Sequence, residues 1–114
     1  MKIIKKLYIA KLVNAIDLQY KMPYKSSNWR MKKYINLTGL FILMYDSKKD
    51  VQYFTWFPYV NNVICYTKGI VSTKIDELTL AKCFQARTQH SIYRFVVVDE
   101  KVSQDLAKEI PKIW

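Results

Sequence analysis

Hydrophobic runs separated by short polar breaks dominate the middle of the chain. The runs "GLFILMY" and "VQYFTWF" flank "DSKKD" (46–50), and "PYVNN" (58–62) leads into "VICYT". Aromatic and β-branched runs joined by brief polar breaks are typical of strands connected by hairpin loops. The pattern therefore predicts a three-stranded meander over residues 35–45, 51–57 and 63–71.

The pattern changes after this meander. The stretch "STKIDELTLAKCFQARTQ" is rich in good helix formers, and Thr73 and Asp76 have the spacing of a capping box, which predicts a helix over 74–88. "SIYRFVVV" (91–98) predicts a fourth strand, because it is β-branched and too short for an independent helix. "SQDLAKEI" (103–110) predicts a final helical segment that ends before Pro111.

The first twenty residues follow neither period cleanly. Their apolar residues fall on opposite sides of a helical wheel, and the alternation of a strand breaks at Lys5 and Lys11. The absence of Gly and Pro favours a helix, with a strand over "KLYIAKLV" (6–13) as the alternative.

These elements predict a small α+β protein with the order β-β-β-α-β-α. A chain of 114 residues is close to the commonest size of one domain, so we expect a single domain over residues 1–114. Its sheet would be mainly antiparallel, with about four strands, one packed helix and a short C-terminal helix. The run "VQYFTWF" is apolar on both faces, so it is either a central strand covered on both sides or a strand with one face given to a ligand, and we expect it to be covered on both sides.

Positive charge is concentrated in the N-terminal third. The chain carries a net charge of +10, and residues 1–40 contain nine Lys or Arg against one acid, Asp17. No acid follows until Asp46. A local positive field of this kind attracts phosphate, anionic lipid or an acidic protein surface, whereas the alternative is ordinary surface lysine that keeps the chain soluble.

The stretch "QYKMPYKSSNWRMKKYINL" combines this charge with aromatic rings. Lys and Arg can displace counterions from phosphates, and aromatic faces can stack on unpaired bases. The alternative is that the rings hold the loop against the core. The sequence predicts a nucleic-acid-binding segment whose candidate residues are Lys21, Lys25, Trp29, Arg30, Lys32, Lys33 and Tyr34, with Tyr24 as another stacking candidate.

His90 is the one histidine and a weak catalytic candidate. A metal-independent ribonuclease needs a base, an acid and a cation, which His90, Tyr93 and Arg87 or Arg94 could supply by type. Neighbouring strand residues point to opposite faces, however, so one short stretch does not assemble them all. An exposed histidine in the connection from the helix to the fourth strand is the favoured interpretation.

Other catalytic chemistry lacks a motif. One histidine and two widely spaced cysteines give no paired metal-ligand spacing, so we expect no metal and no cofactor. "FVVVDE" (95–100) resembles a magnesium-binding strand end, but no phosphate-binding glycine loop accompanies it. Cys65 and Cys83 lie in apolar stretches, and we expect both to be buried and reduced in a cytoplasmic protein.

The predicted function is therefore a small, basic, non-enzymatic protein that binds RNA or DNA. The alternative is an inhibitor or adaptor that binds an acidic or nucleic-acid-binding protein through its aromatic and basic surface. Richness in Lys, Ile, Tyr and Asn is typical of AT-rich genomes, including those of phages and viruses, in which case the compartment would be the host cytoplasm. The N-terminal run is interrupted by Lys11 and Asp17, so we expect neither a secretory signal nor a transmembrane segment.

Overall fold

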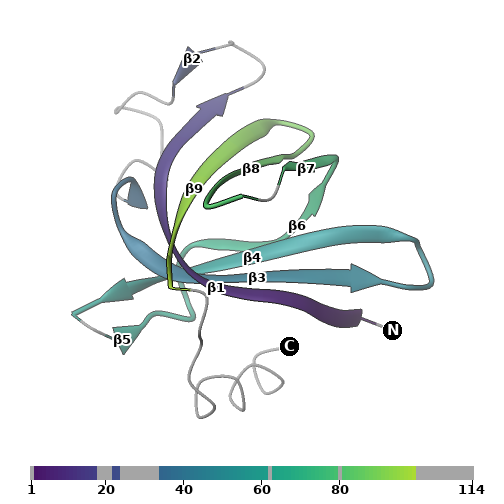
Figure 1. Cartoon of the computed structure of the whole chain (residues 1–114), viewed down its shortest axis with the longest axis horizontal. Coiled ribbons are helices and arrows are strands. Elements are labelled where there is room, and N and C mark those ends of the chain that lie inside the picture. The colour runs from purple at the N-terminus through teal and green to yellow at the C-terminus, as the bar shows by residue number, and fades with distance from the viewer. Residues whose placement is uncertain (1, 18–21, 24–33, 62, 80, 100–114) are drawn as a thin grey trace.

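The protein is an antiparallel β-sheet that curls around an aromatic interior (Figure 1). The computed structural model describes residues 2–17, 22–23, 34–61, 63–79 and 81–99. These residues form nine strands: β1 (Lys2–Asp17), β2 (Met22–Pro23), β3 (Thr38–Asp46), β4 (Val51–Val60), β5 (Val63–Ile64), β6 (Ile70–Ile75), β7 (Glu77–Thr79), β8 (Cys83–Arg87) and β9 (Ser91–Asp99).

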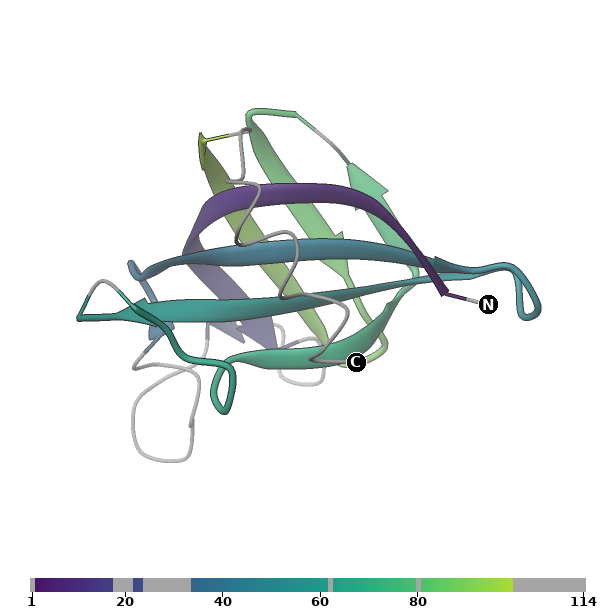
Figure 2. The ribbon, with the colours of Figure 1, turned by 90° about the horizontal axis from the view of Figure 1, so that it is seen from below.

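The strand order closes the sheet on itself. Along the main path the order is β5-β4-β3-β1-β9-β8-β7, and β6 pairs with β4. Only Asp76 separates β6 from β7, and its backbone N–H donates to the carbonyl of Arg87 at 2.7 Å. The continuous segment formed by β6 and β7 therefore pairs with β4 at one end and with β8 at the other, and so it joins the two ends of the sheet. Figure 2 shows the resulting layers, with β3 and β4 (blue to teal) crossing β8 and β9 (green) at a steep angle.

The predicted α+β class is wrong, because the described residues contain no α-helix. The helix predicted over 74–88 is instead the end of β6, then β7 and β8. Good helix formers occupy this stretch, but pairing with β4 and β9 satisfies its backbone and buries Phe84 and Ala86 in the interior. Tertiary burial overrides local helix propensity here. The final helix predicted over 103–110 lies outside the described residues.

The helix favoured for the first twenty residues is also wrong, since β1 is a sixteen-residue strand. Its first half pairs with β3 and its second half with β9. The register shifts between Ile4 and Lys6, and again between Leu12 and Asn14. A bulge inserts one residue and reverses which face the following side chains occupy. These shifts explain why a strict alternation could not be found in the sequence.

The strands predicted around 35–45, 51–57 and 91–98 are present as β3, β4 and β9. The third predicted strand, 63–71, is divided into the two-residue β5, a turn, and the start of β6. Gly69 lies in this turn with φ +101°, and a Cβ there would be 2.1 Å from the carbonyl oxygen of Trp56. The close approach of β6 to β4 therefore requires glycine at this position.

The expectation that "VQYFTWF" is covered on both faces is confirmed. β4 lies between β3 and β6, and Phe54 and Trp56 face the interior with no exposed surface. Phe57 belongs to a separate cluster on the outer face. The Trp56 indole Nε1 donates to the carbonyl of Ala10 at 3.1 Å, which ties β4 to β1 across the interior.

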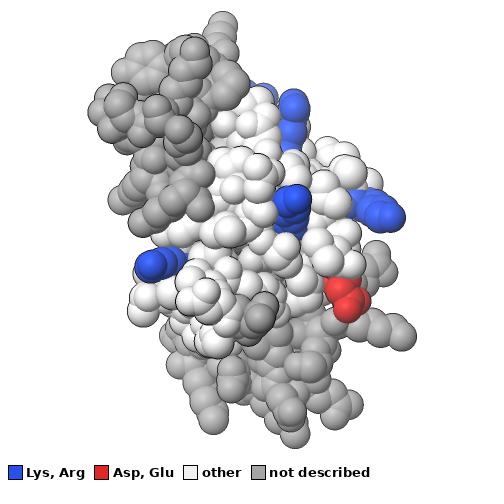
Figure 3. All heavy atoms as spheres, turned by 90° about the vertical axis from the view of Figure 1, so that its left-hand side faces the viewer, with Lys and Arg blue, Asp and Glu red and all other residues white. Residues whose placement is uncertain are grey.

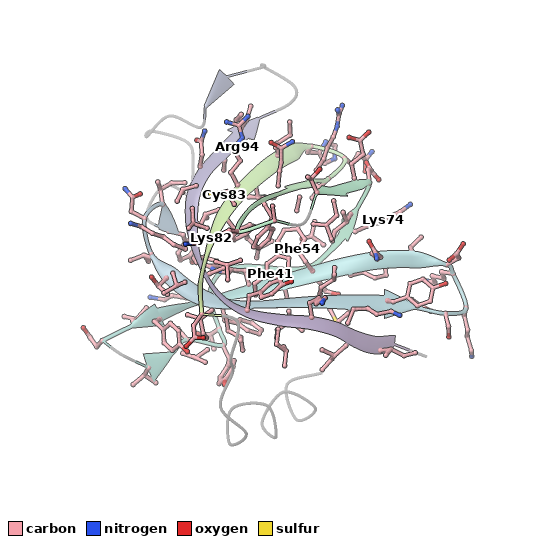
Figure 4. The ribbon with its side chains drawn as sticks, viewed as in Figure 1. Phe41, Phe54, Lys74, Lys82, Cys83 and Arg94 are labelled. Atoms are coloured by element: carbon pink, nitrogen blue, oxygen red, sulfur yellow. The ribbon has the colours of Figure 1, made fainter. Side chains whose placement is uncertain are left out.

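The interior is an aromatic cluster. Phe41 contacts the rings of Phe54, Phe84 and Phe95 at centroid distances of 5.4, 4.7 and 5.2 Å. Figure 4 shows Phe41 and Phe54 within the space that the strands enclose. Edge-to-face and offset contacts of this kind add to the free energy gained from burying the rings. The inner face of the sheet is thus occupied by packing, and a ligand surface is to be sought on the outer face.

Candidate functional site

Most residues of the predicted binding segment lie outside the described part of the chain. These residues are Lys21, Tyr24, Lys25, Trp29, Arg30, Lys32 and Lys33. Tyr34 is described, and its side chain is only 8% exposed. Its ring lies edge-on against Trp56 at a centroid distance of 6.1 Å. Tyr34 thus packs in the interior, where a base could reach its ring only by displacing the core.

Both ends of the basic segment are attached to the second half of β1. At one end Met22 and Pro23 pair with Asp17 and Ile16. At the other end Asn36 N–H donates to the carbonyl of Leu12 at 2.7 Å, and Leu12 N–H donates to the carbonyl of Leu37 at 3.0 Å. The segment between these anchors therefore starts and finishes beside the same strand.

The opposite side of β1 carries a second group of cations. Along β1, Ala10 and Leu12 face the interior, so Lys11 between them faces outward. Lys11 is level with Val96 of β9, and Val96 is level with Cys83 of β8. The next outward positions in register are Asn14, Arg94 and Gln85.

Lys11 and Arg94 therefore share one outer face of β1 and β9, and the exposed Lys82 borders this face just before β8. We call these three cations the basic face. Lys82 immediately precedes β8, and it is exposed, as is Arg94. Figure 4 shows Lys82 and Arg94 on the same side of the molecule. Two strand spacings of about 4.8 Å separate β8 from β1, so the face is roughly 10 Å wide at the backbone.

A hydrogen bond orients the arginine on the basic face. Arg94 Nε donates to Oε1 of Gln85 at 3.0 Å, across the β8–β9 pair. A guanidinium has five N–H donors in a planar fork, and this bond uses one of them. The bond holds the fork over the sheet, which is the arrangement in which arginine binds a phosphate through two parallel hydrogen bonds.

Acidic groups lie mainly at the margins of this face. Arg87 is directly opposite Glu77 in the β7–β8 register, so the negative charge of Glu77 balances the positive charge of Arg87. Asp99 ends β9 at the other margin. Figure 3 shows Lys and Arg side chains spread across one side of the molecule with little acidic surface among the described residues. The described charge therefore leaves a positive field on the outside of the sheet.

Sequence reasoning did not find the basic face. Its cations come from three separate stretches, and the stretch with Lys82 was interpreted as a helix. The signal that could have found it was alternation in "KCFQAR", where apolar Phe84 and Ala86 alternate with Cys83 and Gln85. That alternation has the period of a strand with one buried face.

The residues of the ribonuclease hypothesis are not brought together. His90 is exposed in the turn between β8 and β9, which Thr88 and Ser91 close through reciprocal hydrogen bonds. Tyr93 points the other way and contacts the ring of Phe54 at 5.7 Å. The predicted connection of a helix to a strand is in fact a β-hairpin, although the exposure of His90 is as expected.

The cysteines are free, as expected, but not buried. Cys83 is exposed on the outer face of β8, and Cys65 is half-buried in the turn that follows β5. Apolar neighbours in the sequence misled the prediction, because neighbouring strand residues face opposite sides. Cys65 Sγ lies 3.5 Å from Oγ1 of Thr67, and this hydrogen bond lowers the pKa of the thiol.

Other shifted pKa values lie away from the basic face. Partial burial acts to raise the pKa of Asp46, but hydrogen bonds from the Lys48 and Lys49 amides at 3.0 and 3.4 Å outweigh it, so the pKa is lowered. The hydrogen bond from Tyr45 to Asp50 raises the pKa of the tyrosine. These groups stabilise the β3–β4 turn. Across the described residues no three His, Cys, Asp or Glu side chains gather as metal ligands.

Comparison with protein-family models, with curated proteins and with solved structures found no match for the chain. Within the described residues no helix is long and apolar enough to cross a membrane. The geometry of the described residues therefore has to carry any argument about function.

Proposed function

We propose that the protein binds nucleic acid through the basic face together with the basic segment 21–33. The observation that carries this proposal is that Lys11 and Arg94 share the outer face of β1 and β9, with the exposed Lys82 at its border, and that both ends of that segment are attached to β1. Two cationic regions that are distant in sequence thus border the same strand, β1.

The chemistry of the interaction is mainly phosphate neutralisation. Each Lys or Arg that contacts a phosphate releases a condensed counterion, so the observed affinity falls as salt rises. Arg94, held by Gln85, offers a planar fork for one phosphate, and Lys11 and Lys82 offer point charges. The segment adds Lys21, Lys25, Arg30, Lys32 and Lys33.

Stacking belongs to the same proposal. Trp29 and Tyr24 are its candidates in the segment, since an aromatic face gains roughly 1–3 kcal/mol per stacked base. Tyr34 is better explained as the residue that anchors the end of the segment, because its ring packs against Trp56. A protein with this chemistry prefers single strands, whose bases are free to stack.

A protein partner remains the second candidate, and one observation favours it. Val98 is 58% exposed at the end of β9, and the half-buried Val96 lies two residues before it on the same face. Apolar side chains next to cations are also typical of a surface that binds an acidic protein.

The test is fluorescence anisotropy of labelled single-stranded RNA, single-stranded DNA and duplex DNA, titrated with the protein across a salt series. The eight cations of the face and segment predict a slope of log affinity against log salt of roughly −6 to −7 if all contact phosphates. The double variant Lys82→Glu and Arg94→Glu should reduce the magnitude of this slope by roughly 2 and should lower the affinity for all three nucleic acids.

Lys74→Glu together with Lys48→Glu is the matched control, because both residues are exposed and lie on β6 and in the β3–β4 turn. The control changes the net charge equally and should weaken binding much less. Equal losses in both variants would mean that the protein attracts polyanions only through its net charge. Absence of binding at low salt would favour the protein partner, which a pull-down at moderate salt would then test.

A further inference from the structure

The outer face of the sheet has an apolar half beside its basic half. Leu40, Ile42 and Met44 alternate along β3 with the interior residues, so they face outward, and Phe57 of β4 joins them. Leu40 and Ile42 are 0% exposed and Met44 is 1% exposed. We call these four side chains the outer cluster.

Neighbours within the sheet do not account for this burial. Side chains on adjacent strands lie about 4.5–5.5 Å apart and shield one another's flanks, but the tip of an outward side chain stays open unless another layer covers it. The described residues around the outer cluster cover only part of it: Leu7, Ile9 and Tyr53 flank it from the same sheet, and Tyr66, in the turn after β5, packs edge-on against Phe57 at a centroid distance of 5.2 Å. A covering layer must therefore be supplied from elsewhere.

The end of β9 indicates which part of the chain supplies the cover. Asp99, the last residue of β9, pairs with Ile9, and Ile9 pairs with Leu40 on its other side. The chain after Asp99 thus starts two strands from the outer cluster. The fifteen residues that follow contain Val102, Leu106 and Ile110 at a spacing of four.

We propose that the C-terminal segment, residues 101–114, docks on the outer cluster through Val102, Leu106 and Ile110. As a helix these three side chains would occupy a stripe about 80° wide, with Gln104 and Lys108 on the opposite side and Glu109 beside the edge of the stripe next to Val102. Residues 102–110 would rise about 12 Å, and Leu40 to Met44 span about 14 Å along β3. The length and pattern of the segment match the face that needs a cover.

Docking of the C-terminal segment divides the outer face of the sheet into a covered apolar half and an open basic half. The apolar half is closed by the chain's own end, and the basic face remains the outward surface that a ligand can reach. The inference does not depend on the proposed function, because it uses burial and pattern alone.

The experiment measures the rate at which a thiol reagent labels Met44→Cys in a full-length background with both native cysteines replaced by serine. The inward Leu43→Cys, 2% exposed in the native chain, reports on the interior in a second protein. Each is combined with Leu106→Lys, which disrupts the proposed stripe, or with Gln104→Lys, which places the same charge outside it. Leu106→Ala and Gln104→Ala serve as a milder pair should the lysine variant fold poorly.

We expect the Leu106 variants to label the Met44→Cys thiol at least tenfold faster, with little change at the Leu43→Cys thiol and little effect of the Gln104 variants. Unchanged labelling of the Met44→Cys thiol would overturn the proposal. Equal acceleration at both thiols would also overturn it, because loss of a cover exposes one face selectively. If the Met44→Cys thiol is labelled slowly at high protein concentration but fast after the protein is diluted, the cover is a second copy of the chain, and the proposal is wrong.

Discussion

Gly39 is the position where one added methyl group tests the packing of the interior most directly. A Cβ at Gly39 would lie 2.4 Å from the carbonyl oxygen of Phe57 and 2.7 Å from both Cε2 and Nε1 of Trp56. Contacts this short require the indole or the β3–β4 pair to move. We therefore expect Gly39→Ala to destabilise the protein.

The magnitude follows from what holds the indole in place. Trp56 has no exposed surface, and its Nε1 donates to the carbonyl of Ala10 at 3.1 Å. Overpacking a core typically costs about 1–3 kcal/mol, and loss of a buried hydrogen bond about as much. Alanine also lowers the conformational entropy of the unfolded chain, which stabilises the folded protein by at most about 1 kcal/mol. The net loss in the free energy of unfolding is therefore about 2–4 kcal/mol.

The assay is urea and thermal unfolding followed by far-UV circular dichroism. For a chain of this length the loss corresponds to a fall in Tm of roughly 8–16 °C. Thr38→Ala, on the half-buried neighbour that faces outward, is the control and should change stability by well under half as much. In a Trp56→Phe background Gly39→Ala should cost less, because the smaller ring removes one of the two close contacts.

A stability equal to or above that of the native chain would refute this reasoning. It would mean that the indole and the strand pair can move apart without loss, so the close contact does not explain why glycine occupies this position.

Three further predictions concern hydrogen bonds elsewhere. Thr55→Val removes the hydroxyl that accepts the Ser72 N–H at 2.9 Å, so we expect a loss of about 1–3 kcal/mol in urea unfolding; an unchanged midpoint would contradict it. The lowered pKa of Asp46 contributes stability that is present above its unfolded value and lost as pH falls through the folded one, so Asp46→Asn should flatten the pH dependence of Tm below about pH 4. The Thr67 hydroxyl lowers the pKa of Cys65, so Thr67→Val should shift the pH profile of Cys65 alkylation upward when the other cysteine is serine; an identical profile would exclude that cause.

The strands with strong local patterns were predictable from the sequence. β3, β4 and β9 combine aromatic and β-branched residues with short polar breaks, and each was expected near its observed position. The two-sided burial of β4 was also expected, because its apolar residues occupy both faces. The basic segment was visible as a local run of charge, although its residues, apart from Met22 and Pro23, lie outside the described part of the chain.

The sequence by itself determined where the strongest strands lie, how many positive charges the chain carries and that most of its net positive charge lies in the first third. Only the tertiary structure decided that residues 74–79 and 83–87 form strands rather than a helix, because their pairing with β4 and β9 depends on residues far away in the chain. It also decided that Lys11 and Arg94 share a face and that Lys82 borders it. Strand register sets which distant side chains become neighbours, and two bulges in β1 reset that register along the strand.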